Sequence, residues 1–152
     1  MDPLALAGLV KRLYPNFNLD SFDNRLKLQK FVFILRSQGI DFGYEFNLYL
    51  RGPYSLDLTR DAFHIDNWNN IQKVRFDHDT QESDFQQILD KLEPYKNDVD
   101  WLEIAATLLF LKELHRKDPK ELLFLHFTQL KPQFAQAEVI QAHSDLEKKE
   151  MI

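Results

Sequence analysis

The chain has 152 residues and no cysteine, so disulfides and thiolate chemistry are excluded. Hydrophobic residues make up 44% of it, enough for one core, and we expect a single helical domain over residues 1–152. No apolar run approaches the roughly 20 residues that a membrane span needs, and the first residues lack the basic start of a secretory signal. We therefore expect a cytoplasmic chain that does not contact membranes.

The net charge of −5 is unevenly distributed. Residues 1–51 carry seven Lys/Arg against five Asp/Glu, residues 52–100 five against eleven, and residues 101–152 seven against eight. Non-specific nucleic-acid binding depends on the neutralisation of phosphates by basic residues. A chain with this charge balance is therefore a poor candidate for such binding. Specific DNA binding through a basic face of the first third stays open.

Two helices are predicted first. Asp2 and Pro3 are typical of an N-cap followed by the first helical position, and apolar residues then recur at helical spacing as far as residue 13. After Asp23-Asn24, an i, i+3, i+4, i+7 stripe predicts an amphipathic helix that ends before Gly39.

The period then changes from 3.6 to 2. Residues 44–50 alternate between apolar and polar side chains, which predicts a short half-buried strand ended by Gly52-Pro53. Ser55 is a good N-cap for a helix that we expect to reach residue 66 or 67. Residues 69–77 weakly indicate a second strand, paired with the first.

The second half is predicted to be helical. Asp79-x-x-Glu82 resembles a capping box, Asp100-x-x-Glu103 precedes the most apolar segment, and Asp118-Pro119 is a helix start with Asp118 as N-cap. A last helix is expected from about residue 135. The fold class is therefore mainly α, with six or seven helices and a small β element, and the order in the first half is compatible with a winged-helix-like arrangement.

No catalytic or cofactor-binding motif is present. The four glycines are scattered, so no P-loop or dinucleotide fingerprint exists, and no histidine pair has the HExxH spacing. Asp77-His78-Asp79 with His64 is the nearest approach to a metal cluster, but adjacent residues rarely converge on one ion. We expect no cofactor and no metal.

Acid–base and nucleophilic catalysis are also disfavoured. Asp57 and Asp61 would share one helix face, where helix-dipole and surface roles explain them, and Ser55 has no histidine at helical reach. We expect a protein that is not an enzyme.

Aromatic and basic residues are interleaved between residues 27 and 54. Such a surface can stack on nucleic acid or form an interface with a protein, although aromatic residues of a strand more often belong to the core. The aromatic members are Phe31, Phe33, Phe42, Tyr44, Phe46, Tyr49 and Tyr54.

Two motifs at this spacing, LKLQKFVFIL and GYEFNLYLRGPYSLDL, resemble the small prokaryotic YwgA-like family and, more distantly, the Panacea (SocA-like) antitoxin domains. The segments WLEIAATLLFL and LKPQFAQAEVIQA are also similar to the closing helices of the YwgA-like group. The resemblance implies a predicted regulator, antitoxin or proteolytic adaptor, with no cofactor and no turnover. Arg51 departs from the family pattern, which usually has an aromatic or small residue before Gly-Pro.

The corner Gly52-Pro53-Tyr54-Ser55 has two interpretations. It can serve only to end the strand and cap the next helix. Alternatively, it carries a recognition patch, for which the candidate partner-binding residues are Lys30, Arg51, Tyr54 and Arg60.

Two functions follow from these observations, and a small hydrolase or nuclease that uses Asp57, Asp61 and the histidines is a third, disfavoured hypothesis. The first is a non-enzymatic adaptor or antitoxin-like regulatory module that binds a protein partner. The alternative is a DNA-binding transcriptional regulator that uses a winged-helix-like N-terminal half and an exposed basic face. The oligomeric state is open, since the C-terminal helix and the aromatic strand could each provide a homodimer surface.

Overall fold

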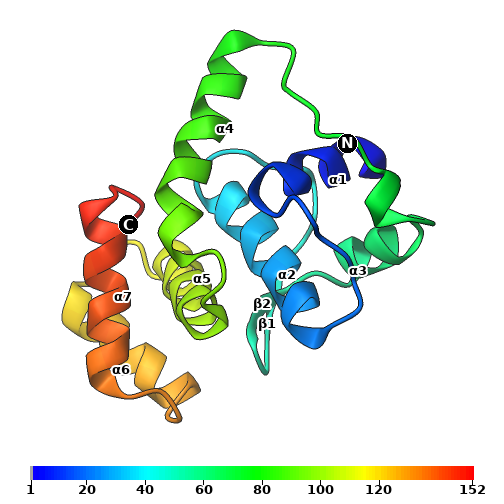
Figure 1. Cartoon of the computed structure of the whole chain (residues 1–152). Coiled ribbons are helices and arrows are strands. Elements are labelled where there is room, and N and C mark those ends of the chain that lie inside the picture. The colour runs from blue at the N-terminus through cyan, green and yellow to red at the C-terminus, as the bar shows by residue number, and fades with distance from the viewer. Residues whose placement is uncertain (1) are drawn as a thin grey trace.

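The computed structural model describes residues 2–152 and contains seven α-helices and one small hairpin (Figure 1). The expected mainly α fold with a small β element is confirmed. Among the described residues, no helix has the length and apolar character needed to cross a bilayer. In chain order the elements are α1 Pro3–Leu13, α2 Phe22–Ser37, β1 Asn47–Tyr49, β2 Gly52–Tyr54, α3 Leu56–Phe63, α4 Asp79–Leu92, α5 Val99–Leu114, α6 Lys120–Leu130 and α7 Gln136–Lys148, with 3₁₀ turns at Trp68–Asn70 and Glu93–Tyr95.

Helices α2 and α5 form the centre of the molecule. They pack against each other, α6 and α7 lie on the far side of α5, and α1 and α3 lie on the other side of α2 (Figure 1). Helix α5 is buried from Trp101 to Leu109, as its continuous apolar sequence predicts. A single cluster of buried side chains takes members from all seven helices.

The two β-strands pair with each other. In the antiparallel register, Asn47 lies opposite Tyr54 and Tyr49 opposite Gly52. The prediction that residues 69–77 supply the second strand is wrong, since that segment is a 3₁₀ turn followed by chain outside any ladder. Gly52 and Pro53 do not end the β element but form its second strand, because a two-stranded hairpin leaves the proline on an edge that needs no donor.

Several helix starts also differ from the sequence prediction. Ser21, rather than Asp23 or Asn24, caps α2, and its Oγ accepts from the backbone N–H of Asn24 at 3.1 Å. The N-cap of α5 is Asp98, and Asp118 lies one residue before the N-cap of α6. Helix α3 ends at Phe63, three residues before residue 66, the earlier of its two expected ends.

The expected capping box of α4 is wrong for a tertiary reason. Helix α4 begins at Asp79, and the Glu82 carboxylate instead accepts two hydrogen bonds from the Arg12 guanidinium on α1, at 2.5 and 2.6 Å. It also accepts from the Phe76 backbone N–H at 3.0 Å. An ion pair between distant helices therefore replaces the local cap.

The start of α3 and the C-terminus of α2 follow the sequence prediction. Ser55 caps α3, with its Oγ accepting from Leu58 N–H at 3.3 Å. Gly39 lies just beyond α2 at φ 98°, and the Ile40 N–H donates to the Leu35 carbonyl at 2.9 Å. The apolar residues of α4 that recur at helical spacing, Phe85, Ile88, Leu89 and Leu92, are buried.

The winged-helix-like expectation is based on a predicted helix–strand–turn–helix order, and the structure has α2, the β1–β2 hairpin and α3 in this part of the chain. The hairpin packs on both α2 and α5, so its position is fixed by the centre of the fold. The winged-helix-like arrangement itself stays a prediction.

Candidate functional site

Gly52 brings the hairpin backbone into contact with α5. Its φ is 94°, in the left-handed region that favours glycine. A Cβ atom at this position would lie 2.8 Å from Thr107 Oγ1 on α5 and 3.4 Å from Lys30 Nζ on α2. At this corner the hairpin backbone therefore packs directly against α2 and α5.

Lys30 lies beneath this corner. The residue is 2% exposed, and its Nζ donates to the Pro53 carbonyl at 2.6 Å. Burial lowers the pKa of Lys30 to about 7, the charge of Glu103 opposes that shift, and the nearby cations of Lys131 and Arg51 add to it. Lys30 therefore holds the hairpin in place from below.

Glu103 is the buried acid of the site. Its side chain is fully buried, with Oε1 2.5 Å from Arg51 Nε and Oε2 2.9 Å from Lys131 Nζ. Lys131 also donates to the Leu50 carbonyl at the tip of the hairpin. We call Glu103, Arg51, Lys131 and Lys30 the Glu103 cluster; it connects the hairpin to α2, α5 and the end of α6.

Sequence reasoning does not find two members of the Glu103 cluster. The sequence pattern places Glu103 at the start of the most apolar helix and Lys131 near a helix end. A lone carboxylate inside the most apolar helix is the signal that could have found the cluster, because a buried charge requires a charged partner.

The two sequence motifs are joined to each other. Gln29 of the Lys-Leu-Gln-Lys motif donates through Nε2 to the Ser55 carbonyl at 2.9 Å, and its Oε1 accepts from the Ser55 N–H at 2.8 Å. Gln29 Nε2 also donates to Thr59 Oγ1 at 2.8 Å, and Thr59 Oγ1 donates to the Tyr54 hydroxyl at 2.6 Å. The interpretation of the corner as a purely structural element therefore has a physical basis. Hydrogen bonds from Gln29 in the first motif hold Ser55 of the second motif in place.

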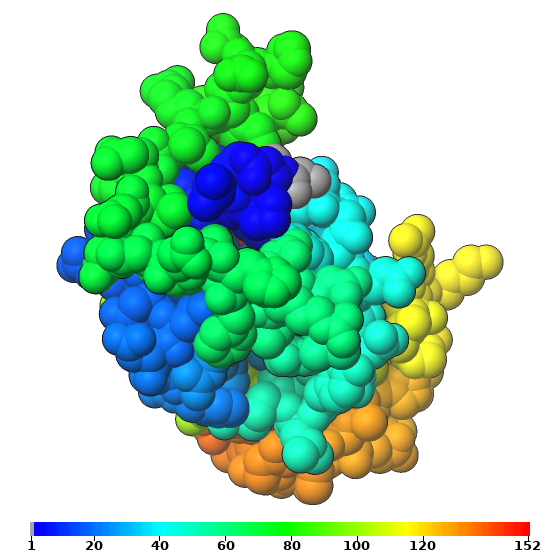
Figure 2. Space-filling model, turned by 90° about the vertical axis from the view of Figure 1, so that its right-hand side faces the viewer, coloured from blue at the N-terminus to red at the C-terminus, as the bar shows by residue number. Residues whose placement is uncertain are grey.

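Beside this framework lies an open groove of about 480 Å³, which we call the corner groove. Figure 2 shows the surface hollowed between the blue segment that begins α2 and the teal segment of the hairpin and α3. Its edges carry large apolar side chains that are at least half exposed, and Leu50, at the hairpin tip, is 91% exposed. The others are Phe22, Tyr49 and Phe63.

The charged side chains that line the corner groove are basic. Arg25, Lys30 and Arg51 line it, and no carboxylate of the described residues does. The Arg51 guanidinium lies 5.5 Å from the Phe22 ring centroid, and its side chain is 42% exposed. The groove therefore combines apolar walls with a positive rim.

The four predicted partner-binding residues do not all meet. Lys30, Arg51 and Tyr54 line the corner groove. Arg60 does not line it; its side chain is 64% exposed and lies 3.6 Å from the Asp57 carboxylate. Tyr54 is half-buried with its hydroxyl bonded to Thr59, so only part of its ring is accessible.

The basic residues of the first half do not form one exposed face. Lys30 is buried, Arg25 donates to the Leu19 carbonyl at 2.7 Å, and Arg51 is paired with Glu103. The alternative of DNA binding needs these three residues on one exposed face together with Lys27 and Arg60.

The candidate catalytic carboxylates have other partners. Asp61 accepts a hydrogen bond from the Tyr44 hydroxyl at 2.6 Å, and burial raises the pKa of Tyr44. Asp57 faces Arg60 at 3.6 Å. Asp77, His78, Asp79 and His64 are not brought together, whereas His115, Asp118 and His126 are, among the residues that the structure describes.

No family model, curated protein or solved structure matches this chain.

Proposed function

We propose that this chain is a non-enzymatic adaptor or antitoxin-like regulatory module that binds a protein partner through the corner groove. The observation that carries the proposal is a 480 Å³ groove with exposed apolar edges and a positive rim in an otherwise acidic chain. Contiguous exposed apolar surface of this kind marks interaction sites in proteins. The resemblance of the two corner motifs to YwgA-like and Panacea sequences supports the same class of function.

The residues that line the corner groove favour one kind of partner segment. Large apolar walls favour the insertion of a large apolar side chain, since burying it removes both surfaces from water. Lys30 is buried and Arg51 is paired with Glu103, so Arg25 and the exposed part of the Arg51 guanidinium are the cations that favour a negative charge beside that apolar group. The occupant is therefore a partner segment that carries a large apolar residue next to Asp or Glu.

The groove is built to hold its shape. The Glu103 cluster fixes the hairpin from below, and Gln29 fixes the start of α3. A preorganised groove loses little conformational entropy when a partner binds, which favours affinity. The motif residues therefore act mainly by holding the groove in shape. The exposed apolar residues at its edges contact the partner.

Selection of random peptides on the immobilised chain tests this function, followed by affinity measurements on wild type and two variants. Leu50→Asp places a charge at the most exposed edge of the groove, and Leu114→Asp makes the same change at a 63% exposed site on α5 outside it. We expect enriched peptides that share an apolar residue next to an acidic one. Their affinity should fall at least tenfold for Leu50→Asp and less than twofold for Leu114→Asp.

Amide versions of the selected peptides test the charge. Replacing the acidic residue by its amide should weaken binding to the wild-type chain. The proposal is wrong if no peptide is enriched, or if both aspartate variants bind as well as wild type. Tight, salt-dependent binding of duplex DNA without peptide binding would support the alternative regulator instead.

A further inference from the structure

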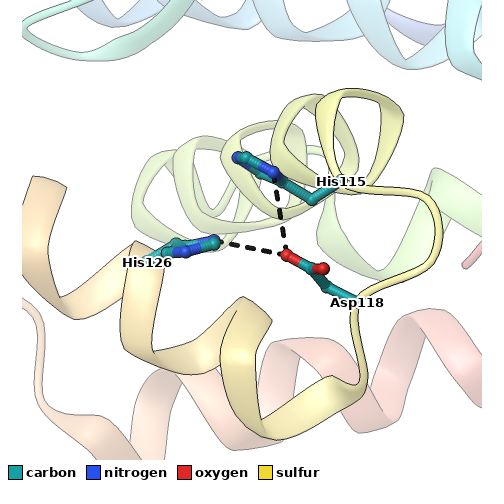
Figure 3. A group of neighbouring side chains, drawn as sticks. All are labelled: His115, Asp118 and His126. Carbon is teal, nitrogen blue, oxygen red and sulfur yellow. Dashed lines mark ion pairs between the residues drawn. The ribbon is translucent and has the colours of Figure 1, made fainter.

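Two histidines and an aspartate converge at the turn between α5 and α6. His115 is the C-cap of α5, Asp118 lies in the turn, and His126 is on the second turn of α6 (Figure 3). One potential ligand atom from each of the three side chains lies within 4.8 Å of the other two. The imidazole ring centroids are 4.5 Å apart.

The backbone brings the three together. The Asp118 N–H donates to the His115 carbonyl at 3.0 Å, which closes the turn after α5. Helix α6 then starts at Lys120 and runs back so that His126 faces the same point. The spacing His-x-x-Asp-x₇-His is therefore set by a short turn and about two turns of helix.

Asp118 forms an ion-pair contact with each histidine but no hydrogen bond with either (Figure 3). Asp118 Oδ2 is 3.7 Å from His115 Nδ1 and 4.0 Å from His126 Nδ1, both beyond hydrogen-bonding distance. His126 Nδ1 is buried and has no hydrogen-bond partner among residues 2–152. A buried nitrogen without a partner, aimed at a carboxylate and a second imidazole, is an arrangement that a cation would complete.

The separations suit a small divalent ion. In a tetrahedral zinc site with bonds of about 2.0 Å, ligand atoms lie about 3.3 Å apart. To reach this separation, the Asp118 carboxylate oxygen would have to move less than 1 Å closer to each imidazole nitrogen. Two imidazoles and one carboxylate are ligands that Zn²⁺ takes, whereas Ca²⁺ and Mg²⁺ require mainly oxygen.

We propose that His115, Asp118 and His126 form a zinc-type metal site that fastens the α5–α6 turn. Three protein ligands leave a fourth coordination position, which is open to water because the His115 and Asp118 side chains are 41% and 31% exposed. The ion holds the end of α5 to the second turn of α6. The site is separate from the corner groove, whose lining includes none of these residues.

Zinc titration of the full chain tests the site. The protein is prepared without a polyhistidine tag, stripped with a chelator and titrated with Zn²⁺ by calorimetry. We expect one equivalent to bind to wild type, and an affinity at least tenfold lower in His126→Gln. His115→Ala, at an exposed position, is the second variant if His126→Gln does not fold.

His78→Ala is the matched control, because His78 is an exposed histidine in the acidic segment before α4. It should bind zinc as wild type does, and zinc should raise the melting temperature of both but not of His126→Gln. With Co²⁺ in place of Zn²⁺, wild type but not His126→Gln should show the intense visible absorption of a tetrahedral ion. The site does not exist if wild type and His126→Gln bind zinc equally, or if His78→Ala loses as much affinity as His126→Gln does.

Discussion

At the scale of single residues, Lys30 shows how one position can belong to a motif and yet not be a surface contact. The sequence predicts that it touches a partner, and it lines the corner groove, but the residue is 2% exposed and its amine donates to the Pro53 carbonyl. A periodic pattern marks only the apolar stripe of a helix. It does not indicate that a lysine beside that stripe lies under a hairpin from the next segment.

Lys30 makes a prediction about pH. Its folded-state pKa of about 7 lies below the ordinary lysine value, so between pH 7 and 10.5 the unfolded chain binds a proton that the folded chain does not. This residue therefore makes the free energy of unfolding rise with pH, by about 2 kcal/mol between pH 7 and 9. Urea unfolding of wild type and Lys30→Met at both pH values measures the effect, because Met removes the titrating group.

The difference in unfolding free energy between wild type and Lys30→Met should shift in favour of wild type at pH 9. Parallel changes in the two proteins would mean that the amine stays charged throughout. Its hydrogen bond to Pro53 would then be that of an ammonium held by Glu103.

At the scale of elements, the hairpin depends on Gly52. Gly39 and Gly52 have nearly the same φ, 98° and 94°, but a Cβ atom added at Gly39 would have no neighbour within 4 Å, whereas one added at Gly52 would have several. Alanine substitutions at the two positions therefore separate the free-energy cost of the backbone conformation from that of a steric clash.

Gly39→Ala should cost about 1 kcal/mol of unfolding free energy through its backbone conformation alone. Gly52→Ala should cost about 3 kcal/mol, because its methyl group would also lie 2.8 Å from Thr107 Oγ1. Chemical denaturation of both variants measures the difference. Equal costs would show that the hairpin moves away from α5 freely, and the combined Gly52→Ala, Thr107→Ala variant should recover part of the loss.

At the scale of the whole molecule, long-range polar contacts connect elements that the sequence presents as separate. Arg12 and Glu82 join α1 to α4, and Glu103 joins the hairpin to α5 and α6. Trp101 on α5 donates to Asp145 on α7 at 3.0 Å. These contacts hold the two ends of the chain to one core.

The Arg12–Glu82 pair makes the last prediction. Hydrogen bonds from Arg12 hold the pKa of Glu82 below its usual range. The pair therefore stabilises the fold fully above the unfolded carboxyl pKa, and this contribution is lost as pH falls through the lower folded-state value. Thermal unfolding of wild type and Glu82→Gln should show wild type more stable at pH 6, with the difference shrinking towards pH 3.

Asp84→Asn is a suitable control, since Asp84 is exposed on the same helix. It should change stability little at either pH. A difference between wild type and Glu82→Gln that is the same at pH 6 and pH 3 would contradict the role given to the ion pair.

The sequence by itself determined the mainly α fold with a small β element, the most apolar helix and the caps at Asp2 and Ser55. These features depend on neighbours within a few residues, where the period of apolar side chains and capping chemistry act. The sequence also placed Lys30, Arg51 and Tyr54 near one corner, because the two motifs that hold them are close along the chain.

Only the tertiary structure decided the rest. It paired β1 with Gly52–Tyr54, took Glu82 out of its expected cap and paired Glu103 with Arg51. It also separated Arg60 from the groove and brought His115, Asp118 and His126 together. In the Glu82 and Glu103 cases, a charged side chain found a partner more than 50 residues away. A buried charge without such a partner is costly, so ion pairs across the fold outweigh local capping preferences that contribute only about 1 kcal/mol each.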